Sequence, residues 1–300
     1  MLESMETLVA LAECGTMRRT ALKLHISQSA VSKRIDNLES ILARRLIEPR
    51  GRRVELTPEA RRFVDKLRPL LAELRQLFLM EESGTHGRIE LDLSVSVLIA
   101  GGSKALAHVQ STLLKLELKV NAHHASVAVE RVRSGETMLA LVQGEASSAP
   151  DLAALPVLRQ TIVIIPSGLG KLRLPRRGGV LRVIAIEEHT EAWSFIHTGL
   201  RTGLPEWGFN IEVGDRLQSF SAIAEMARAG FGHGLVPSGV ANALGIQPKQ
   251  VLLLPSPGIH VPVSLVGRRS TLARPLVQTF YQALLATVRG QGRAEASFQG

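Results

Sequence analysis

The hydrophobic pattern of the chain changes its period near residue 88, and this change limits the possible folds more than any other feature. Before it, apolar residues recur at the spacing of helix faces. From Arg88 onward, short apolar segments with the two-residue period of strands alternate with helical segments. Because strands that alternate with helices form parallel sheets with helices on both faces, we expect an α+β chain of several domains, ending in a long α/β region.

The length and the charge of the chain divide it further. Its 300 residues are about twice the usual size of one domain. We expect a first domain over residues 1–57, a linking helix and hinge over 58–87, an α/β domain over 88–290 and a disordered tail over 291–300. The formal net charge is +9, and the basic excess is densest in residues 1–62, with 12 Lys and Arg against 8 Asp and Glu. This balance favours a polyanionic partner for the first domain.

Three further features indicate the compartment. No apolar stretch approaches the length of a membrane span. Residues 1–6 lack the basic and apolar segments of a secretory signal. The single cysteine, Cys14, excludes a disulfide framework and a thiolate metal cluster. We therefore expect a cytoplasmic protein with no membrane partner.

Short helices are predicted before residue 40. Gly15 and Thr16 end a helix over 5–13 and begin another over 17–24. Ser27 is a good N-cap for a third helix over 28–39, which buries one apolar face and presents short polar and basic side chains elsewhere. This arrangement is typical of a helix-turn-helix whose second helix enters the major groove of double-stranded DNA. The candidate DNA-contacting residues here are Ser27, Gln28, Ser29, Ser32, Lys33 and Arg34.

The segment 47–57 predicts two short strands around a basic hairpin. Its Arg50, Arg52 and Arg53 are placed to contact phosphates or the minor groove, as the wing of a winged helix-turn-helix does. Taken singly, a polar helix face is more often only solvated, and a basic hairpin is often only a soluble turn. The combination of both with the helix-turn-helix spacing favours DNA binding.

A long helix is predicted to follow, with Thr57 as its cap and Pro58 at its first position. Pro69 lies inside it and predicts either a kink or two consecutive helices. Apolar residues alternate spacings of four and three, which favours the pairing of two chains into a homodimer. Packing of the helix on its own domain is the alternative. The seam residues are Phe63, Leu67, Leu70, Leu74 and Leu77.

Polar residues in the α/β region occur where strands give way to helices, which is where ligands bind in such sheets. Hydroxyls and backbone amides at helix starts suit a small carboxylate, and the net charge of +5 over residues 89–300 favours an anion over a cation. The alternative is that each Ser or Thr only caps a helix. The candidate ligand-contacting residues are Ser94 and Ser96 at the end of a strand over 89–97, His124, Ser126, Thr190 and Ser219.

The first domain closely resembles the signature of LysR-type transcriptional regulators. The resemblance rests on the run Leu24–Ser32, on Leu38-Glu39, on Leu46 and on Leu56-Thr57. It implies that Gln28, Ser29, Ser32 and Lys33 face bases and that Arg34 and the wing arginines face the DNA backbone. The sequence departs from the pattern with Ser29 in place of Pro, Ile47 in place of Phe and Arg61 in place of Gly. Of these, Ser29 limits any inference about operator preference.

The remainder resembles the effector domain of the same family, which is similar to type 2 periplasmic binding proteins. The matching stretches are 133–142, with Met138 where Asp is usual, and 230–237. The resemblance implies subdomain I over about 88–157 and 266–290, and subdomain II over about 158–265. It also implies crossing hinge segments near 155–160 and 261–266, a co-inducer cleft, a homodimer or homotetramer, and RNA polymerase as a partner at the promoter.

Enzymatic function is not expected, since the sequence has no nucleophile elbow, phosphate-binding loop or His-Glu-x-x-His motif. His123 and His124 would point to opposite faces of a strand, so no metal site or cofactor is expected. The α/β region has no cysteine for a redox switch. We expect a sequence-specific DNA-binding regulator that senses a small co-inducer, an anion being favoured. The alternative is a DNA-binding protein whose C-terminal domain serves only oligomerisation.

Overall fold

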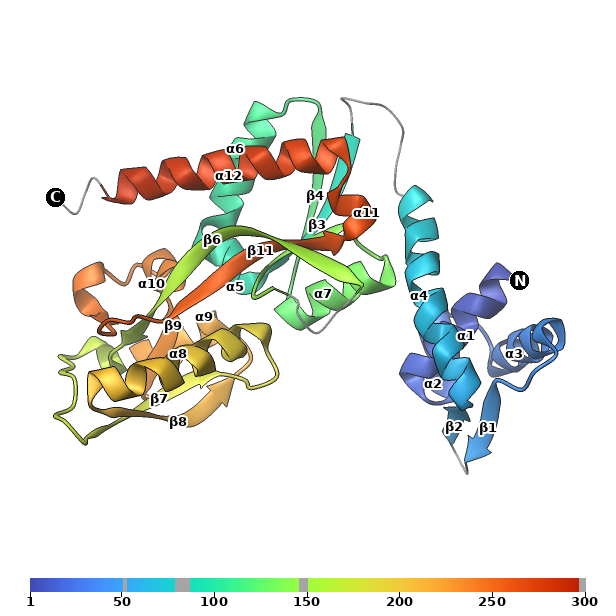
Figure 1. Ribbon diagram of the computed structural model, residues 1–300, viewed down its shortest axis with the longest axis horizontal. Helices are drawn as coiled ribbons and strands as arrows, with labels where there is room; N and C mark the ends of the chain where they lie inside the picture. Colours follow the sequence, from blue (N-terminus) through green and yellow to red (C-terminus); the bar gives the residue numbers. More distant parts are fainter. Residues whose placement is uncertain (51–52, 79–86, 146–150, 297–300) are drawn as a thin grey trace. The chain divides into compact units, whose positions relative to one another are not determined.

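The computed structural model describes residues 1–50, 53–78, 87–145 and 151–296, which fall into two compact units (Figure 1). The first unit contains residues 1–78 and 134–136, and the second contains the described residues of 87–133 and 137–296. The two units are described separately below.

The first unit is a winged helix-turn-helix. Its core is formed by apolar residues that recur at helical spacing, among them Leu8, Leu11, Ile35 and Leu38, all of them buried. A two-stranded antiparallel wing pairs Ile47 with Leu56 and Arg50 with Arg53. The elements in chain order are α1 (Leu2–Cys14), α2 (Met17–Leu24), α3 (Gln28–Leu42), β1 (Ile47–Arg50), β2 (Arg53–Leu56) and α4 (Pro58–Phe78).

Capping residues set the helix boundaries of this unit, as the sequence predicts. Gly15 ends α1 in the left-handed conformation with φ of 67°. Thr16 and Ser27 begin α2 and α3, and their hydroxyls accept hydrogen bonds from the backbone N–H groups of Arg19 and Ala30, at 3.2 and 3.1 Å. The side chain of Glu39 adds a link that sequence analysis missed. Its carboxylate accepts from the backbone N–H groups of residues 46 and 47, which ties α3 to the start of the wing.

The linking helix α4 is one helix of 21 residues with Pro69 inside it, so of the two alternatives that Pro69 left open, two consecutive helices are excluded. Thr57 caps it, accepting from the N–H of Ala60 at 3.1 Å. Proline removes one backbone hydrogen bond, and the bonds of the flanking turns carry the helix past it. The predicted seam is not uniform, because Leu67 is buried whereas Leu70 is 62% exposed. Phe63 and Leu74 are half-buried, and the side chain of Leu77 lies outside the described residues.

The second unit is built on one mixed nine-stranded sheet, not on purely parallel sheets as predicted. The strand order is β4-β3-β5-β11-β6-β9-β7-β8, with β10 paired to β6. Each outer group of three strands is parallel, and the two long strands β6 and β11 run antiparallel to their neighbours and to each other. The strands are β3 (Gly87–Ser94), β4 (Leu116–His123), β5 (Leu139–Gln143), β6 (Leu152–Ile165), β7 (Val180–Ile186), β8 (Asn210–Leu217), β9 (His233–Pro237), β10 (Leu252–Leu253) and β11 (His260–Arg268).

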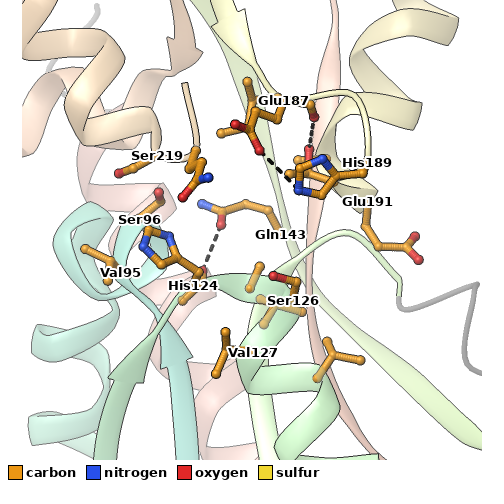
Figure 2. Close-up of a pocket in the computed structure, with 18 of the residues that line it drawn as sticks. Val95, Ser96, His124, Ser126, Val127, Gln143, Glu187, His189, Glu191 and Ser219 are labelled. Carbon is orange, nitrogen blue, oxygen red and sulfur yellow. Dashed lines mark hydrogen bonds and ion pairs between the residues drawn. The ribbon is translucent and has the colours of Figure 1, made fainter. Parts of the chain in front are cut away.

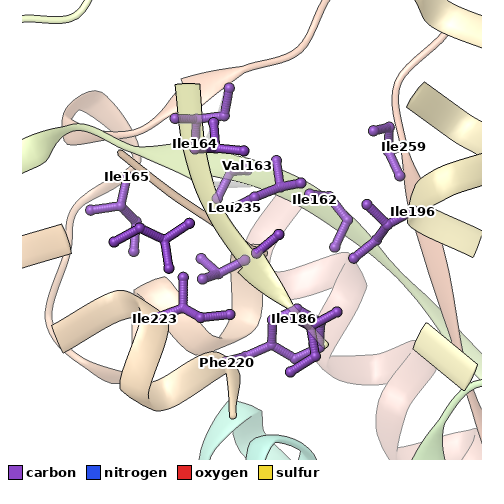
Figure 3. Packing of buried hydrophobic residues seen from close by; sticks show 14 of the residues in the cluster. Ile162, Val163, Ile164, Ile165, Ile186, Ile196, Phe220, Ile223, Leu235 and Ile259 are labelled. Carbon is purple, nitrogen blue, oxygen red and sulfur yellow. The ribbon is translucent and has the colours of Figure 1, made fainter. Parts of the chain in front are cut away.

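The strands β6 and β11 pass from one half of this unit to the other. Three apolar clusters lie along them: one around Leu91, Leu141 and Phe280, a small one around Val132, Val142 and Val266, and one around Ile164, Ile223 and Leu235, which Figure 3 shows. The ladder between them shifts register between Val263 and Ser264. The segments predicted to cross, 155–160 and 261–266, lie within this pair of strands and flank the irregularity.

Helices pack over both halves of the sheet. The observed bounds of two elements differ from those predicted from the sequence. The strand predicted over 89–97 ends at Ser94, because Val95 to Val97 turn into a short helix capped by Ser94. The last helix continues to Ala296, so residues 291–296 are helical where a disordered tail was expected, and 297–300 lie outside the described residues. The helices are α5 (Val95–Val97), α6 (Ser103–Thr112), α7 (Ala125–Ser134), α8 (Glu191–Trp207), α9 (Phe220–Arg228), α10 (Ser238–Ala243), α11 (Arg269–Leu272) and α12 (Pro275–Ala296), with a π-helical turn at Leu98–Gly102 and single 3₁₀ turns at Ser167–Leu169 and Pro248–Gln250.

Candidate functional site

The helix α3 presents a polar edge to solvent and an apolar face to its own core. Val31, Ile35 and Leu38 are buried on the inner face. The first turns of the outer face are exposed, and the hydroxyls of Ser27 and Ser29 lie 2.9 Å apart. The exposed candidates are Ser27, Gln28, Ser29, Ser32 and Lys33. A helix of this kind, with free donors and acceptors at its start, has the shape and chemistry that the major groove admits.

Arg34 differs from the other candidates on this helix. Its guanidinium donates to the carboxylate of Glu3 on α1 at 2.5 Å and lies 3.5 Å from the hydroxyl of Thr7. It is therefore engaged within the first unit, and a phosphate would compete with Glu3 for its N–H donors. The backbones of Arg50 and Arg53 pair in the wing. The side chains of Arg50, Arg52 and Arg53 lie outside the described residues.

One carboxylate joins three helices of the first unit. Glu13 on α1 accepts from Lys23 on α2 at 2.6 Å and from Arg68 on α4. The hydrogen bond from Lys23 raises the pKa of this amine above its ordinary value of 10.5, and partial burial opposes the shift. This cluster could not be predicted from the sequence, because its members come from three different helices.

A cavity of about 360 Å³ lies in the second unit, and all six predicted ligand-contacting residues line it (Figure 2). It is formed where the ends of β3, β4, β5 and β7 meet the starts of α7, α8 and α9. The six residues are Ser94, Ser96, His124, Ser126, Thr190 and Ser219. The rule that ligands bind beyond the carboxyl ends of strands therefore led to residues that share one cavity.

Two of the six also cap helices, as the alternative interpretation proposed. The Ser94 hydroxyl accepts from the N–H of Val97 at 3.4 Å, and Thr190 accepts from the N–H of Trp193 at 3.2 Å. Ser219 makes no side-chain cap; its hydroxyl lies 2.6 Å from that of Ser221. Ser94 and Thr190 thus hold the cavity wall in place while they line it.

Gln143 is one of the polar lining residues that were not predicted from the sequence, and it is the most deeply buried of them. It ends β5, whose other four residues are all apolar and buried, and its side chain is itself only 3% exposed. The Ser94 hydroxyl donates to Gln143 Oε1 at 2.8 Å, whereas Gln143 Nε2 is buried without a hydrogen-bond partner among the described residues. A polar residue closing an apolar strand at a sheet's carboxyl edge is the signal that could have found it.

The charged groups at the cavity are mixed. Glu187 pairs with His189 at 3.1 Å, and the guanidinium of Arg133 lies 3.7 Å from Glu130. Glu191 completes the charged lining. The net charge of +5 over residues 89–300 favoured an anion. Residues 166–186 account for this excess, because they hold five basic residues and no acidic one while the rest of the region is balanced. None of these five basic residues lines the cavity.

Gly144 fixes the approach of α8 to the cavity wall. Its φ is 107°, a conformation that side chains rarely adopt, and a Cβ at this position would lie 2.4 Å from Cβ of Glu191. Its N–H donates to the carbonyl of Pro262 on β11 at 2.9 Å. A glycine is therefore required for the close contact between these segments.

Two features are absent from the part of the chain that the structure describes. No helix in this part is long and apolar enough to cross a membrane. Within the same described ranges, no three His, Cys, Asp or Glu side chains gather in a way that could hold a metal ion. Cys14 is a free, half-buried thiol on α1.

Comparisons with known proteins agree with this architecture. Residues 2–61 match the family described as "Bacterial regulatory helix-turn-helix protein, lysR family", and residues 82–289 match the "LysR substrate binding domain". The chain is 26% identical over 291 residues to an uncharacterized HTH-type transcriptional regulator of Vibrio cholerae, covering 95% of this chain and 96% of that protein.

Solved structures share the fold over nearly the whole chain. A full-length OxyR variant of Pseudomonas aeruginosa superposes with a TM-score of 0.58 at 14% identity, covering 95% of this chain and 97% of that one. Full-length CbnR complexed with its target DNA gives a TM-score of 0.51 at 15% identity, covering 96% and 99%. The winged helix-turn-helix, the α/β unit on its mixed sheet and both family matches lead to one conclusion: the chain belongs to the LysR family of bacterial transcriptional regulators and carries its DNA-binding and effector-binding domains.

Proposed function

We propose that this regulator binds promoter DNA sequence-specifically and that a small molecule bound in the cavity of the second unit changes that binding. The observation that carries the DNA half is the exposed polar edge of α3, whose opposite face is held by the core. The observation that carries the effector half is the meeting of all six candidate residues around one cavity with an unpaired buried amide.

In the DNA complex, Gln28, Ser29, Ser32 and Lys33 contact base edges from the major groove. Ser27 caps the helix and lies beside the first of them. The wing arginines contact phosphates, which position the protein without specifying sequence. Arg34 joins them after leaving Glu3, an exchange of one exposed ion pair for another that costs little free energy.

Two chains present two recognition helices to a two-fold operator. The exposed Leu70 on α4 supports pairing along this helix, because an apolar side chain at this position of a seam is expected to be covered by a partner. The assembly is then a homodimer or homotetramer that acts with RNA polymerase at the promoter.

Ligand binding acts through the two halves of the second unit. The cavity is lined by residues from both halves, and the strands β6 and β11 connect them through an irregular register. A ligand that binds one arrangement of the halves more tightly shifts the population toward it, and only this difference in affinity can move the DNA-binding helices.

Equilibrium binding to duplex DNA tests the proposal that the regulator recognises a specific sequence. Duplexes selected from a random pool by the full chain should bind about a thousandfold or more tighter than scrambled duplexes of the same composition. Binding should also weaken linearly in log affinity against log salt, with a slope of about −0.9 for each phosphate contacted. Equal affinity for selected and scrambled duplexes contradicts sequence-specific recognition.

The second candidate is a DNA-binding protein whose effector domain only assembles oligomers. It is less well supported, because a surface that serves assembly alone has no use for a buried amide left unpaired in a cavity. Thermal unfolding separates the two. A ligand at about 100 times its Kd should add about 2.7 kcal/mol to the stability of the second unit, whereas an assembly domain gives no selective shift.

A further inference from the structure

The amide oxygen of Gln143 accepts a hydrogen bond, whereas its amide nitrogen has no partner among the described residues. Its Oε1 accepts from the Ser94 hydroxyl at 2.8 Å. Because the same hydroxyl accepts from the N–H of Val97, its own proton is available for Gln143, and this orients the amide with Oε1 toward Ser94 and Nε2 away from it. Nε2 finds no partner among the described residues although it is buried. A buried donor without a partner is destabilising in the empty protein, so its presence in the lining of a cavity points to a ligand that accepts its hydrogen bond.

The polar groups of the cavity are divided between two sides. Figure 2 shows Gln143 in the middle, with Ser96, His124 and Ser219 toward one side and Glu187 and His189 toward the other. The side with the Gln143 amide offers hydroxyls and an imidazole, all of which can donate. The opposite side holds carboxylates, which repel a second negative charge.

Apolar groups occupy the space between these two sides. Val127, Val142 and Ile186 line the cavity, and Phe220 is a buried part of its wall. A ligand that fits therefore carries an acceptor group on the Gln143 side and an apolar body; a second anionic group would face Glu187 and Glu191, because Arg133 in the same lining already lies 3.7 Å from Glu130.

We propose that Gln143 is the residue that selects the ligand, and that the ligand class is small monocarboxylic acids with an apolar body. One carboxylate oxygen accepts from Gln143 Nε2, and the hydroxyl of Ser96, which lines the same cavity, is the second donor to that group. This assignment rests on the proposed effector function of the cavity. It does not rest on the net charge of the region, which lies in residues 166–186 outside the cavity.

Ser94 is a positioning residue in this arrangement. Its hydroxyl orients the amide through Oε1, and the ligand would bind at Nε2. Ser94→Ala should weaken carboxylate binding by less than a variant of Gln143 does, because the amide remains present but rotates freely.

Binding of matched probes to the full chain tests the proposal. The probes are butyrate, butyramide, butylamine and succinate, with benzoate, benzamide, benzylamine and phthalate as an aromatic set. Wild type should bind a monocarboxylate more tightly than the amine and the dicarboxylate of its set, as measured by calorimetry and by the shift in Tm.

Three variants assign the effect to Gln143. Gln143→Met keeps the shape and removes the donor, and it should raise the Kd of the carboxylate about tenfold or more. Gln143→Glu adds a like charge and should raise it further. Gln110→Glu is the matched control, since Gln110 is exposed on α6 and does not line the cavity; its Kd should equal that of wild type.

The stability of the empty protein separates ligand selection from a structural role. Gln143→Met removes the unpaired donor but also the Oε1 that accepts from the buried Ser94 hydroxyl, so the two changes oppose each other and its Tm without ligand should lie close to that of wild type. A lower Tm together with unchanged carboxylate binding overturns the proposal. Preferential binding of amines or dicarboxylates overturns the ligand class, as does a failure of every monocarboxylate in both sets to bind at millimolar concentration.

Ligand binding measured together with affinity for the selected duplex distinguishes the assignment to Gln143 from the proposed effector function on which it rests. If monocarboxylates bind through Gln143 but leave the affinity for the selected duplex unchanged, the effector function fails and the ligand assignment holds. If a ligand changes DNA binding equally in wild type and Gln143→Met, the assignment to Gln143 fails and the effector function holds.

Discussion

The candidate serine and glutamine side chains are exposed to solvent in the first unit, whereas Ser94 and Gln143 in the second are buried. On α3, Gln28 and Ser32 are exposed, and water satisfies their polar atoms when no DNA is bound. In the second unit, Gln143 and Ser94 are buried, and the free end of the Gln143 amide is left unsatisfied. A solvated recognition residue costs no folding free energy, whereas a buried one does. Burial therefore identifies Gln143 as a ligand-contacting candidate from energetics, while Gln28 is identified only by its position on a helix.

The largest expected effect comes from the core beneath each site. Ile35→Ala should destabilise the first unit by about 2–5 kcal/mol, because Ile35 is fully buried under the recognition edge. DNA binding should fall with it, and ligand binding in the second unit should not. Ile196→Ala, in the core of the second unit, should have the reverse effect: it should weaken ligand binding and leave DNA binding unchanged. Calorimetric unfolding with and without ligand measures both, and loss of ligand binding in Ile35→Ala contradicts the independence of the sites.

The next effect concerns the wall of the cavity. Gly144→Ala should cost about 1–3 kcal/mol from its left-handed backbone and should also weaken ligand binding, because the new Cβ overlaps Glu191. Gly245→Ala is the matched control, since Gly245 has φ of 75° and no atom within 4 Å of a new Cβ. Chemical denaturation and ligand titration should show a stability loss in both and a binding loss only in Gly144→Ala. Equal ligand affinity in the two variants contradicts the role assigned to Gly144.

At the exposed polar edge of α3, a substitution is expected to change binding specificity without changing stability, unlike Gly144→Ala at the cavity. Gln28→Ala should leave the unfolding free energy within about 0.5 kcal/mol of wild type, because the side chain is exposed. It should reduce discrimination between the selected duplex and a single-base variant by about 1–3 kcal/mol. Competition binding with duplexes mutated one base at a time measures this. A uniform loss of affinity across all sequences would assign Gln28 to the phosphate backbone instead.

The smallest effect is a pH dependence of the first unit. The pKa of Lys23 is raised above 10.5 by its hydrogen bond to Glu13. Its stabilisation is therefore fully present below pH 10.5 and is lost as pH rises through the higher folded-state pKa. Because this amine is half exposed, the contribution is at most about 1 kcal/mol. Unfolding of wild type and Lys23→Met should differ at neutral pH and converge at high pH; a constant difference contradicts the linkage.

Local signals in the sequence were sufficient for much of the first unit. The caps at Gly15, Thr16 and Ser27 depend on residues no more than four positions away, so their hydrogen bonds could be predicted from spacing. The pairing of Arg34 with Glu3 could not, because it joins residues 31 positions apart on two packed helices.

The second unit shows the same limit more clearly. The strand β8 was missed because Gly214 and charged residues interrupt its alternation, and its pairing with β7 supplies what its own sequence lacks. The antiparallel course of β6 and β11 was missed because a βα alternation predicts the parallel groups on either side but not the strands that connect them.

The sequence by itself determined the family signature, the capped helices of the DNA-reading unit and six residues that were expected at a ligand site. Tertiary structure alone decided that those six share one cavity and that Gln143 stands among them with a free amide nitrogen. The physical reason is range. Helix periods and caps act within one or two turns, whereas the cavity depends on β5 pairing with β11, where Gln143 lies opposite Val263 across 120 positions of the chain.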